Sequence, residues 1–335
     1  MTDAGQEFTS PTDFTFNMEV LSSLRDAVGE CIVELGRENP KMVVVVADVA
    51  TSSRVNPFAA EFPDRFYNVG IAEQSLMSFA AGLAQEGFMP YAFTFAPFAA
   101  MRACEQVRDD ICYNGLPVRI IGNGAGYSNG ESGATHCALE DVAIFTALGN
   151  MTVIEPGDPS QIQQVLNATL NWDKPIYIRM GRESTGSLYP AGADFQIGKA
   201  GVPKDGDDGA FIAAGIVTHH AVEAAKRLES DFGARVRVVD MHTIKPLDQA
   251  AVLSAAKTGH VVAAQDHSVI GGLGSAVGAV LAENGVGIDF KILGCPDHYV
   301  PIATPNYLYR LNGYDADGLY ETMRRMLKLG SAPHN

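Results

Sequence analysis

The sequence predicts an α/β protein built from two parallel or mostly parallel domains, and three observations carry that prediction. Helical periodicity and short apolar runs alternate along the chain, which is typical of parallel α/β folds. A stretch rich in Gly, Pro, Ser and Asp, residues 183–209, interrupts this alternation and is interpreted as a linker. The chain of 335 residues is also longer than one compact core usually holds.

The first domain is expected over residues 20–182. It begins with a helical pattern at 21–37, followed by the run MVVVVAD at 42–48, whose continuous apolar character is typical of a strand covered on both faces. Further helices are expected at 73–86, 98–114, 139–148 and 158–171, and further strands at 88–94, 117–122, 151–154 and 175–179.

The second domain is expected over residues 210–330 and is smaller. Its strands are predicted at 210–216, 235–241, 260–265 and 288–293, and its helices at 219–232, 248–257, 271–284 and 317–328. Residues 1–19 form an acidic, polar N-terminal extension that lacks the basic and apolar regions of a secretory signal. We therefore expect a cytoplasmic protein.

The composition excludes several classes of function. The net charge of −15 is spread along the chain and repels nucleic acid, although a local basic pocket for a phosphate remains compatible with it. No apolar run is long and uninterrupted enough to suggest a membrane span. The five cysteines form no C-x-x-C pair and are expected to be reduced. Neither a G-x-G-x-x-G fingerprint nor a Walker A loop is present.

The segment FYNVGIAEQ, residues 66–74, places Glu73 between a strand-like run and an apolar helical run. A carboxylate in such surroundings needs a partner, although a simple acid in the first turn of a helix would also be stabilised by the helix dipole. Aromatic residues Phe95 and Phe98 follow a predicted strand, and His136 ends a glycine-rich loop. An aromatic wall beside a buried acid suits a heteroaromatic ring with one protonatable nitrogen.

Several of these motifs resemble one family. The segments FPDRFYNVGIAEQSLMSFAAGLA, FTFAPF, ESGATHCALED and PIYIRMGR resemble the pyrimidine-binding domain of thiamine diphosphate enzymes of the transketolase family. Residues 236–278 are similar to the C-terminal domain of that family. The resemblance covers roughly residues 20–330, with the motifs in the family's order.

The resemblance implies a role for each candidate residue. Glu73 is expected to hydrogen-bond N1′ of the cofactor's aminopyrimidine, so that the tautomer able to activate the thiazolium carbon is favoured. Phe95 and Phe98 match positions that line the aminopyrimidine, with plain core packing as the alternative. His136 matches a histidine that contacts substrate oxygens and transfers protons, and the alternative is a structural histidine.

The remaining matches concern the substrate. Asp48, Thr51 and Ser52 match a loop that the family places near the thiazolium and the substrate phosphate, although short polar residues after a strand are also ordinary turn formers. Arg182 matches the arginine that binds a sugar phosphate, with Arg179 as its rival. Ser132 stands where transketolases commonly carry an aspartate, which indicates altered recognition of substrate hydroxyls.

One expected part of the family's site is absent from the sequence. The family binds diphosphate and a divalent metal such as Mg²⁺ through a separate domain with a Gly-Asp-Gly motif, and the nearest counterpart here, Gly206–Gly209, reads as a turn. We therefore expect the C-terminal-half subunit of a split transketolase, working with an N-terminal-half subunit in an α2β2 heterotetramer that binds diphosphate and metal on the partner. It would transfer a two-carbon ketol unit between sugar phosphates.

Two other interpretations stay open at this point. The β subunit of a 2-oxo-acid dehydrogenase E1 component has the same domain pair, but usually shows His-Ser-Gln where this chain has Thr135, His136 and, further on, Leu139-Glu140-Asp141. A non-catalytic assembly subunit could also keep the fold, although the joint presence of Glu73, Phe95 and His136 argues against it. A deoxyxylulose phosphate synthase is disfavoured because it keeps its diphosphate domain in the same chain.

Overall fold

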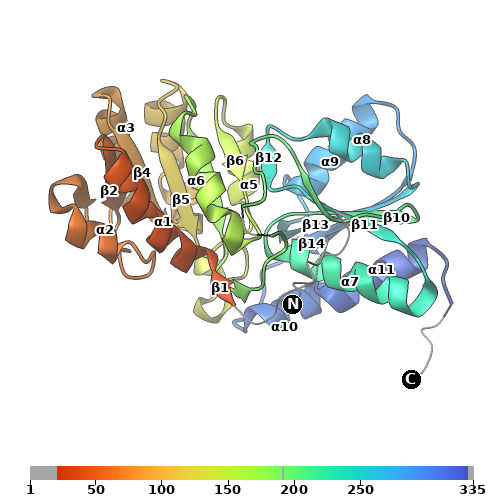
Figure 1. Cartoon of the computed structure of the whole chain (residues 1–335). Helices are drawn as coiled ribbons and strands as arrows, with labels where there is room; N and C mark the ends of the chain where they lie inside the picture. Colours follow the sequence, from red (N-terminus) through yellow and green to blue (C-terminus); the bar gives the residue numbers. More distant parts are fainter. Residues whose placement is uncertain (1–20, 191, 331–335) are drawn as a thin grey trace, which may run out of the picture.

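A computed structural model describes residues 21–190 and 192–330 of the chain. The predicted N-terminal extension therefore lies outside the described residues. The described part forms two large β-sheets, each with helices on both faces, lying side by side as shown in Figure 1, and a small two-stranded sheet. This agrees with the predicted pair of α/β domains.

The first sheet has the strand order β12-β6-β7-β5-β4-β2-β3 among the described residues. Its strands are β2 (Met42–Val46), β3 (Phe66–Asn68), β4 (Met89–Phe95), β5 (Arg119–Asn123), β6 (Thr152–Ile154), β7 (Ile176–Met180) and β12 (Thr243–Lys245). All neighbours in it are parallel except β12 and β6. The carboxyl ends of β2, β3, β4, β5 and β7 therefore lie at one edge of the sheet.

The helices of this half pack on the two faces of the first sheet. They are α1 (Leu24–Glu38), α2 (Asn56–Glu61), α3 (Glu73–Gln85), α4 (Cys104–Gln106), α5 (Asp141–Ala147) and α6 (Ile162–Leu170). Helices α1, α2 and α6 share one apolar core with the sheet, whereas α3 and α5 share another. The run MVVVV of β2 is buried throughout because both faces are covered.

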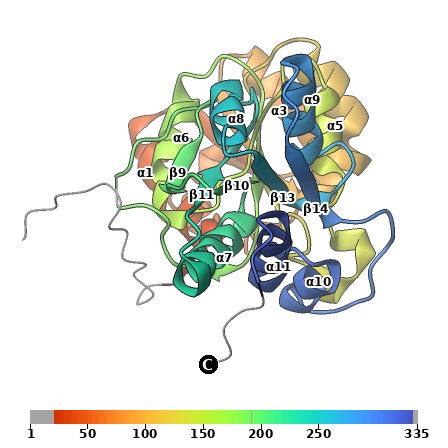
Figure 2. The same ribbon diagram turned by 90° about the vertical axis from the view of Figure 1, so that its right-hand side faces the viewer.

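The second sheet has the order β14-β13-β10-β11-β9, and β9 is its antiparallel edge strand. Its strands are β9 (Gly201–Lys204), β10 (Gly209–Ala213), β11 (Val236–Asp240), β13 (His260–Ser268) and β14 (Asp289–Cys295), and its helices are α7 (Ile216–Phe232), α8 (Gln249–Ala256), α9 (Leu273–Glu283), α10 (Pro305–Asn312) and α11 (Ala316–Met326). Helices α8 and α9 cover one face, and α7 and α11 the other (Figures 1 and 2).

Three short strands differ from the sequence-based expectation. Strand β9 and the two-residue strand β8 (Ser184–Thr185), which pairs with β1 (Ser22–Ser23), both fall within the range interpreted as a linker. Strand β12 follows β11 in the chain, yet it completes the edge of the first sheet against β6. These strands pair with residues far apart in the sequence. The local periodicity of apolar side chains therefore does not predict them.

The predicted helix at 98–114 is not a regular α-helix. It consists of a π-helical turn, η2 (Phe98–Arg102), the short α4 and a second π-helical stretch, η3 (Val107–Cys112). The amide of Ala103 donates to the carbonyl of Phe98 at 3.2 Å, the five-residue spacing of a π turn. Turns of this type occur frequently at functional sites. Within the described residues, no helix is long and apolar enough to cross a membrane.

Candidate active site at the carboxyl edge of the first sheet

The segments predicted to carry function meet at the carboxyl edge of the first sheet. Asp48 follows β2, Glu73 follows β3, Phe95 ends β4, the loop 124–136 follows β5, and Arg182 follows β7. Ligands in open α/β sheets bind at this edge, because the loops that leave parallel strands converge there. The topology therefore brings together residues that are far apart in the sequence.

Glu73 is the first residue of α3, and its side chain is only 2% exposed. Its Oε2 accepts a hydrogen bond from an Nη of Arg102 at 2.8 Å. Among the described residues, no hydrogen bond to its Oε1 is found. The helix N-terminus and Arg102 together offset the cost of burying a carboxylate. The sequence argument that Glu73 needs a partner is thus confirmed, and the partner in the structure is Arg102.

Three aromatic rings lie close to one another, and one of them, Phe98, contacts Arg102, the partner of Glu73. The ring centroids of Phe95 and Phe98 are 6.0 Å apart in an edge-to-face arrangement. The imidazole of His136 lies 5.2 Å from Phe98 and 6.0 Å from Phe95. The Nδ1 of His136 is 3.0 Å from the hydroxyl of Thr135, whereas Nε2 makes no hydrogen bond to the part of the chain that the structure describes. The cluster offers flat apolar faces next to one proton-carrying ring.

Asp48 takes part in the turn that leads from β2. It has a positive φ of 58°, a left-handed conformation that aspartate tolerates better than most residues. The side-chain amide of Asn68 donates to Oδ1 of Asp48 at 3.0 Å and accepts from the Asp48 amide at 3.1 Å. The same Asn68 oxygen accepts from the amide of Gly70. Asp48 therefore stabilises the turn that precedes Glu73, which fits the alternative of a turn former as well as a ligand role.

A group of arginines lies at the same edge, and one of them, Arg25, was not among the residues predicted from the sequence. Arg25 donates to the backbone carbonyl of Ser52 at 2.9 Å. Burial lowers the pKa of Arg25, and the positive charges of Arg182 and then Arg54 lower it further. Arg25 lies in the first turn of α1, where the helix dipole disfavours a cation, and this unfavourable placement was a signal in the sequence.

Arg182 itself is exposed, and its guanidinium donates to the side-chain carbonyl of the buried Asn129. Its backbone amide donates to Glu183 at 2.9 Å. These contacts hold Arg182 with its side chain exposed, and its positive charge is near enough to Arg25 to lower the pKa of Arg25. The two arginines give this edge of the sheet a local positive charge in a chain of net charge −15.

Two further candidates lie apart from these contacts. Ser132 is exposed in the short helix η4 (Gly130–Ser132), and its side chain makes no hydrogen bond among the described residues.

Arg179, considered as a rival for phosphate binding, is only 1% exposed, and every nitrogen of its guanidinium already donates within the protein. It donates to Asp141 at 2.8 Å, to Glu155, and to the backbone carbonyls of Ala138 and Asp266. Its role is structural.

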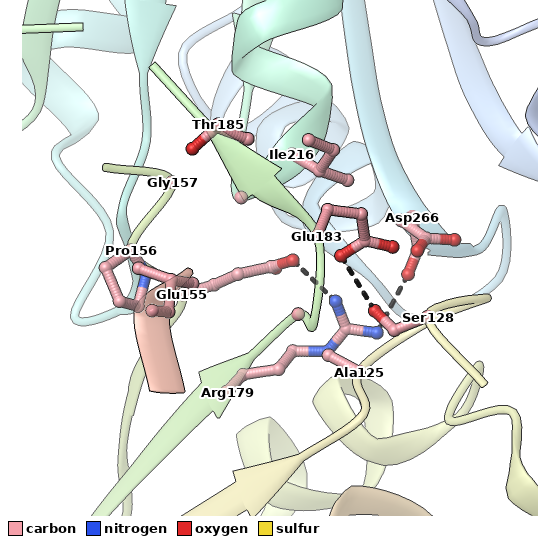
Figure 3. A pocket seen from close by; sticks show the side chains of 13 residues that line it. Ala125, Ser128, Glu155, Pro156, Gly157, Arg179, Glu183, Thr185, Ile216 and Asp266 are labelled. Atoms are coloured by element: carbon pink, nitrogen blue, oxygen red, sulfur yellow. Dashed lines mark hydrogen bonds and ion pairs between the residues drawn. The ribbon is translucent and has the colours of Figure 1, made fainter. Parts of the chain in front are cut away.

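The buried ion pairs of Arg179 lie at the seam between the two sheets, beside a small cavity shown in Figure 3. Asp266, at the end of β13, accepts hydrogen bonds from the hydroxyls of Tyr309 and Tyr314 and, at 2.9 Å, from the amide of Tyr127. Gly126 has a φ of +55°, and a Cβ there would clash with the carboxylate of Asp266. The loop 124–136 is therefore fixed against the second half of the chain.

Asp266 is expected to make stability depend on pH. Burial raises its pKa from 3.8 to about 7, against the lowering effect of Arg179. Between about pH 4 and 7 the folded state therefore holds a proton that the unfolded state has lost, so stability falls as pH rises across this range. Asp266→Asn should make this fall shallower. Asp240, whose pKa burial also raises to about 7, would account for the pH dependence that remains in this variant. Thermal unfolding of the wild type and of Asp266→Asn between pH 5 and 8 measures how steeply the stability of each falls with pH.

The matched control for this prediction is Asp64→Asn, which changes an exposed carboxylate in η1 (Pro63–Arg65). It should leave the pH dependence as in the wild type. The amide of Asn at position 266 keeps an oxygen for the Tyr127 amide, so the variant should fold. An unchanged slope in Asp266→Asn would contradict the assignment of this titration to Asp266.

Comparison with known families agrees with this architecture. Residues 22–187 match the transketolase pyrimidine-binding domain, and residues 198–319 match the transketolase C-terminal domain. The chain therefore belongs to the transketolase family, whose members are in general transferases that depend on thiamine diphosphate. Within that family it is the C-terminal-half subunit of a split transketolase, as its relatives show.

The relatives that show this have nearly the length of this chain. A putative transketolase C-terminal section from Methanocaldococcus jannaschii is 36% identical over 92% of this chain and 98% of its own length. A 6-deoxy-6-sulfo-D-fructose transketolase subunit from Clostridium sp. is also 36% identical, over 88% of this chain and 91% of its own length. An apulose-4-phosphate transketolase subunit from Actinobacillus succinogenes is 33% identical over 89% of this chain and 96% of its own.

Solved structures give the same result. A split-gene transketolase, described as an inactive β4 tetramer, superposes with a TM-score of 0.84 and 42% identity over 92% of this chain and 99% of that chain. A transketolase from Campylobacter jejuni shows the same fold, with a TM-score of 0.77 and 19% identity, and this chain covers 48% of it. Split homologues imply a separate N-terminal-half subunit as partner.

Proposed function

We propose that this subunit binds the aminopyrimidine end of thiamine diphosphate and, with its N-terminal-half partner, transfers a two-carbon ketol unit between sugars with an anionic end. The observation that carries the proposal is the buried carboxylate of Glu73, which lies at a helix N-terminus and keeps Oε1 without a hydrogen bond among the described residues. With the rings of Phe95 and Phe98 beside it, this donor set fits an aromatic ring that carries a proton.

Each residue of the site has a proposed part in this reaction. When bound, thiamine diphosphate supplies a carbon nucleophile that acts as an electron sink after C–C cleavage. Glu73 hydrogen-bonds the N1′ atom of the aminopyrimidine, and Phe95 and Phe98 exclude water from that bond, which strengthens it. We assign to His136 the transfer of protons at substrate oxygens through Nε2, the ring nitrogen that makes no hydrogen bond within the described residues. We assign Asp48 to the cofactor and Ser52 and Ser132 to the substrate, as the resemblance to the family implies.

The cofactor's diphosphate and its Mg²⁺ are proposed to bind to the partner subunit. The segment Gly206–Gly209 leads from β9 into β10, and the amide of Asp208 donates to the carbonyl of Arg235, just before β11. Within the described residues, no group of three or more His, Cys, Asp or Glu side chains could hold a metal ion. A diphosphate with two anionic groups needs a metal and oriented donors. We propose an α2β2 assembly that completes the site.

Arg25 and Arg182 are proposed to bind the anionic end of the sugar. The names of two relatives mention a sulfonated and a phosphorylated sugar, and both groups carry the negative charge and oxygen acceptors that guanidinium groups bind. The same two arginines can serve either group. The shared chemistry is an oxyanion at the end of the sugar opposite the ketol unit.

The test of the proposed function is reconstitution. The purified chain and its N-terminal-half partner, with thiamine diphosphate and Mg²⁺, should convert a ketose and an aldose with phosphate or sulfonate ends into the two products of two-carbon transfer. The chain alone should not do so. Transfer by this chain without a partner would contradict the shared site, and decarboxylation of a 2-oxo acid with transfer to a lipoyl group would favour the E1 alternative.

The arginine assignment gives a separate prediction. Arg182→Met and Arg25→Met should each raise the KM for the phosphorylated or sulfonated sugar about tenfold to a hundredfold, because each removes charge-assisted hydrogen bonds to the oxyanion. The kcat should fall less, since both arginines are assigned to the end of the sugar opposite the ketol unit. Steady-state kinetics with charged and uncharged sugars of the same chain length separates the two effects.

Arg37→Met is the matched control for these arginine variants. Arg37 lies at the other end of α1, is 59% exposed and pairs with Glu61. It should leave the KM for every sugar unchanged. Equal KM changes for charged and uncharged sugars would contradict the assignment of Arg25 and Arg182 to the anionic end.

A further inference from the structure

Arg102 is a residue of the cofactor site that the proposed function does not yet use. It ends the π-helical turn η2, and its side chain is 47% exposed, whereas its partner Glu73 is 2% exposed. One nitrogen of its guanidinium donates to Oε2 of Glu73 at 2.8 Å. Its Cζ atom lies 4.3 Å from the centroid of the Phe98 ring, within the range of a cation–π contact.

These two contacts involve the same groups that the proposed function assigns to the cofactor ring. Glu73 is the acid that would bind N1′, and Phe98 is one of the rings that would line the aminopyrimidine. A guanidinium is a planar cation with N–H donors in its plane. An aminopyrimidine protonated at N1′ is also planar and cationic, and it has an N–H in its plane. Both groups are suited to stacking on Phe98 while donating to Glu73.

We propose that Arg102 competes with the aminopyrimidine for the ring face of Phe98 and for the negative charge of Glu73, whose Oε1 is already open to N1′, and that cofactor binding requires the Arg102 side chain to leave both groups. This inference rests on the proposed function. Arg102 itself is half exposed, so water can solvate its guanidinium when it leaves, and the protonated aminopyrimidine then replaces it as the partner of the buried carboxylate. Until then it keeps the buried carboxylate paired, which avoids the penalty of an uncompensated charge. The apparent affinity for the cofactor is reduced by the fraction of molecules in which Arg102 holds Glu73.

The position of Arg102 relative to the aromatic cluster supports this competition. Phe98 contacts Arg102 on one side and the imidazole of His136, at 5.2 Å, on another. The π turn begins at Phe98 and ends at Arg102. The arginine side chain therefore contacts the ring of Phe98 in its own turn and also reaches Glu73 at the N-terminus of α3. Movement of Arg102 therefore exposes a face of Phe98 and an oxygen of Glu73 together.

Titration calorimetry of the assembled two-subunit complex with thiamine diphosphate and Mg²⁺ tests the proposal. Arg102→Met keeps an apolar stem but removes the planar cation, and should bind the cofactor about threefold to thirtyfold more tightly than wild type. Arg102→Lys keeps the charge without the flat face and should lie between the two. The control Arg108→Met, from η3, removes an exposed arginine that pairs with Asp109 and should bind as the wild type does.

The outcomes separate the two proposals. Weaker binding by Arg102→Met would show that Arg102 positions Glu73 for the cofactor, and equal binding would show that the two do not compete; either result overturns the competition and leaves the proposed function standing. Failure of the wild-type complex to bind thiamine diphosphate would instead overturn the proposed function. A crystal structure of the wild-type complex with cofactor gives a second measurement, in which the guanidinium should no longer contact Phe98 or Glu73.

Discussion

Replacing Glu73 with glutamine will lower the kcat of the reconstituted two-subunit enzyme about 10²-fold to 10⁴-fold at saturating cofactor, the range that a positioned acid or base contributes. Glutamine keeps the size of the side chain and can still hydrogen-bond a ring nitrogen. It cannot exchange a proton with that nitrogen, and it cannot hold the negative charge that Arg102 now neutralises. Steady-state kinetics with saturating thiamine diphosphate measures the loss.

The control for this prediction is Glu86→Gln, which changes an exposed acid at the C-terminal end of the same helix, α3. It should leave kcat unchanged. Calorimetry of cofactor binding and thermal unfolding of both variants will show whether the complex still assembles. An unchanged rate in Glu73→Gln would contradict the role of Glu73 and favour a subunit that keeps the fold without taking part in the chemistry.

Replacing Arg179 with methionine will lower the free energy of unfolding by about 3–5 kcal/mol, the usual cost of leaving buried charges without their partner. The guanidinium of Arg179 neutralises Asp141 and Glu155, both nearly inaccessible to solvent, and it ties them to the backbone of Asp266. Burial raises the pKa of Glu155, and Arg179 opposes that rise. Urea unfolding, monitored by circular dichroism, measures this loss of unfolding free energy.

Arg227→Met is the matched control for the stability prediction. Arg227 and its partner Asp317 are 40% and 63% exposed, so loss of this pair should cost less than about 1 kcal/mol. If Arg179→Met does not fold, Arg179→Lys keeps a charge but makes fewer hydrogen bonds and should give an intermediate loss. Equal, small losses for the Arg179 and Arg227 variants would contradict a central role of Arg179 at the seam.

Short-range patterns predicted most elements within a few residues. The apolar run before Asp48 became β2, and the helical period after Glu73 became α3. Helix α10 was missed, although it begins with Pro305 in its first turn and ends at Gly313 with a left-handed φ of 72°, both of which are boundary signals. Strand β12 was missed for a different reason, because its hydrogen bonds join it to a strand some ninety residues away.

The candidate site likewise contains some features that the local sequence predicted and others that only the fold brings together. The sequence by itself determined that Glu73 needs a partner and that Phe95, Phe98 and His136 follow strands whose carboxyl ends meet, because strand direction and residue type are local properties. Their roles toward cofactor and substrate stay predictions, to be decided by the variants above.

Only the tertiary structure decided which charges meet. Arg102 and Glu73, 29 residues apart, form an ion pair, and Arg25 lies beside Arg182, which is more than 150 positions further along the chain. The structure also separated Arg182 from Arg179, which look alike in the sequence. One is exposed at the edge of the sheet, and the other is buried among acids at the seam. The reason is physical: electrostatic partners are chosen by distance and burial, and both are set by how the two sheets pack together.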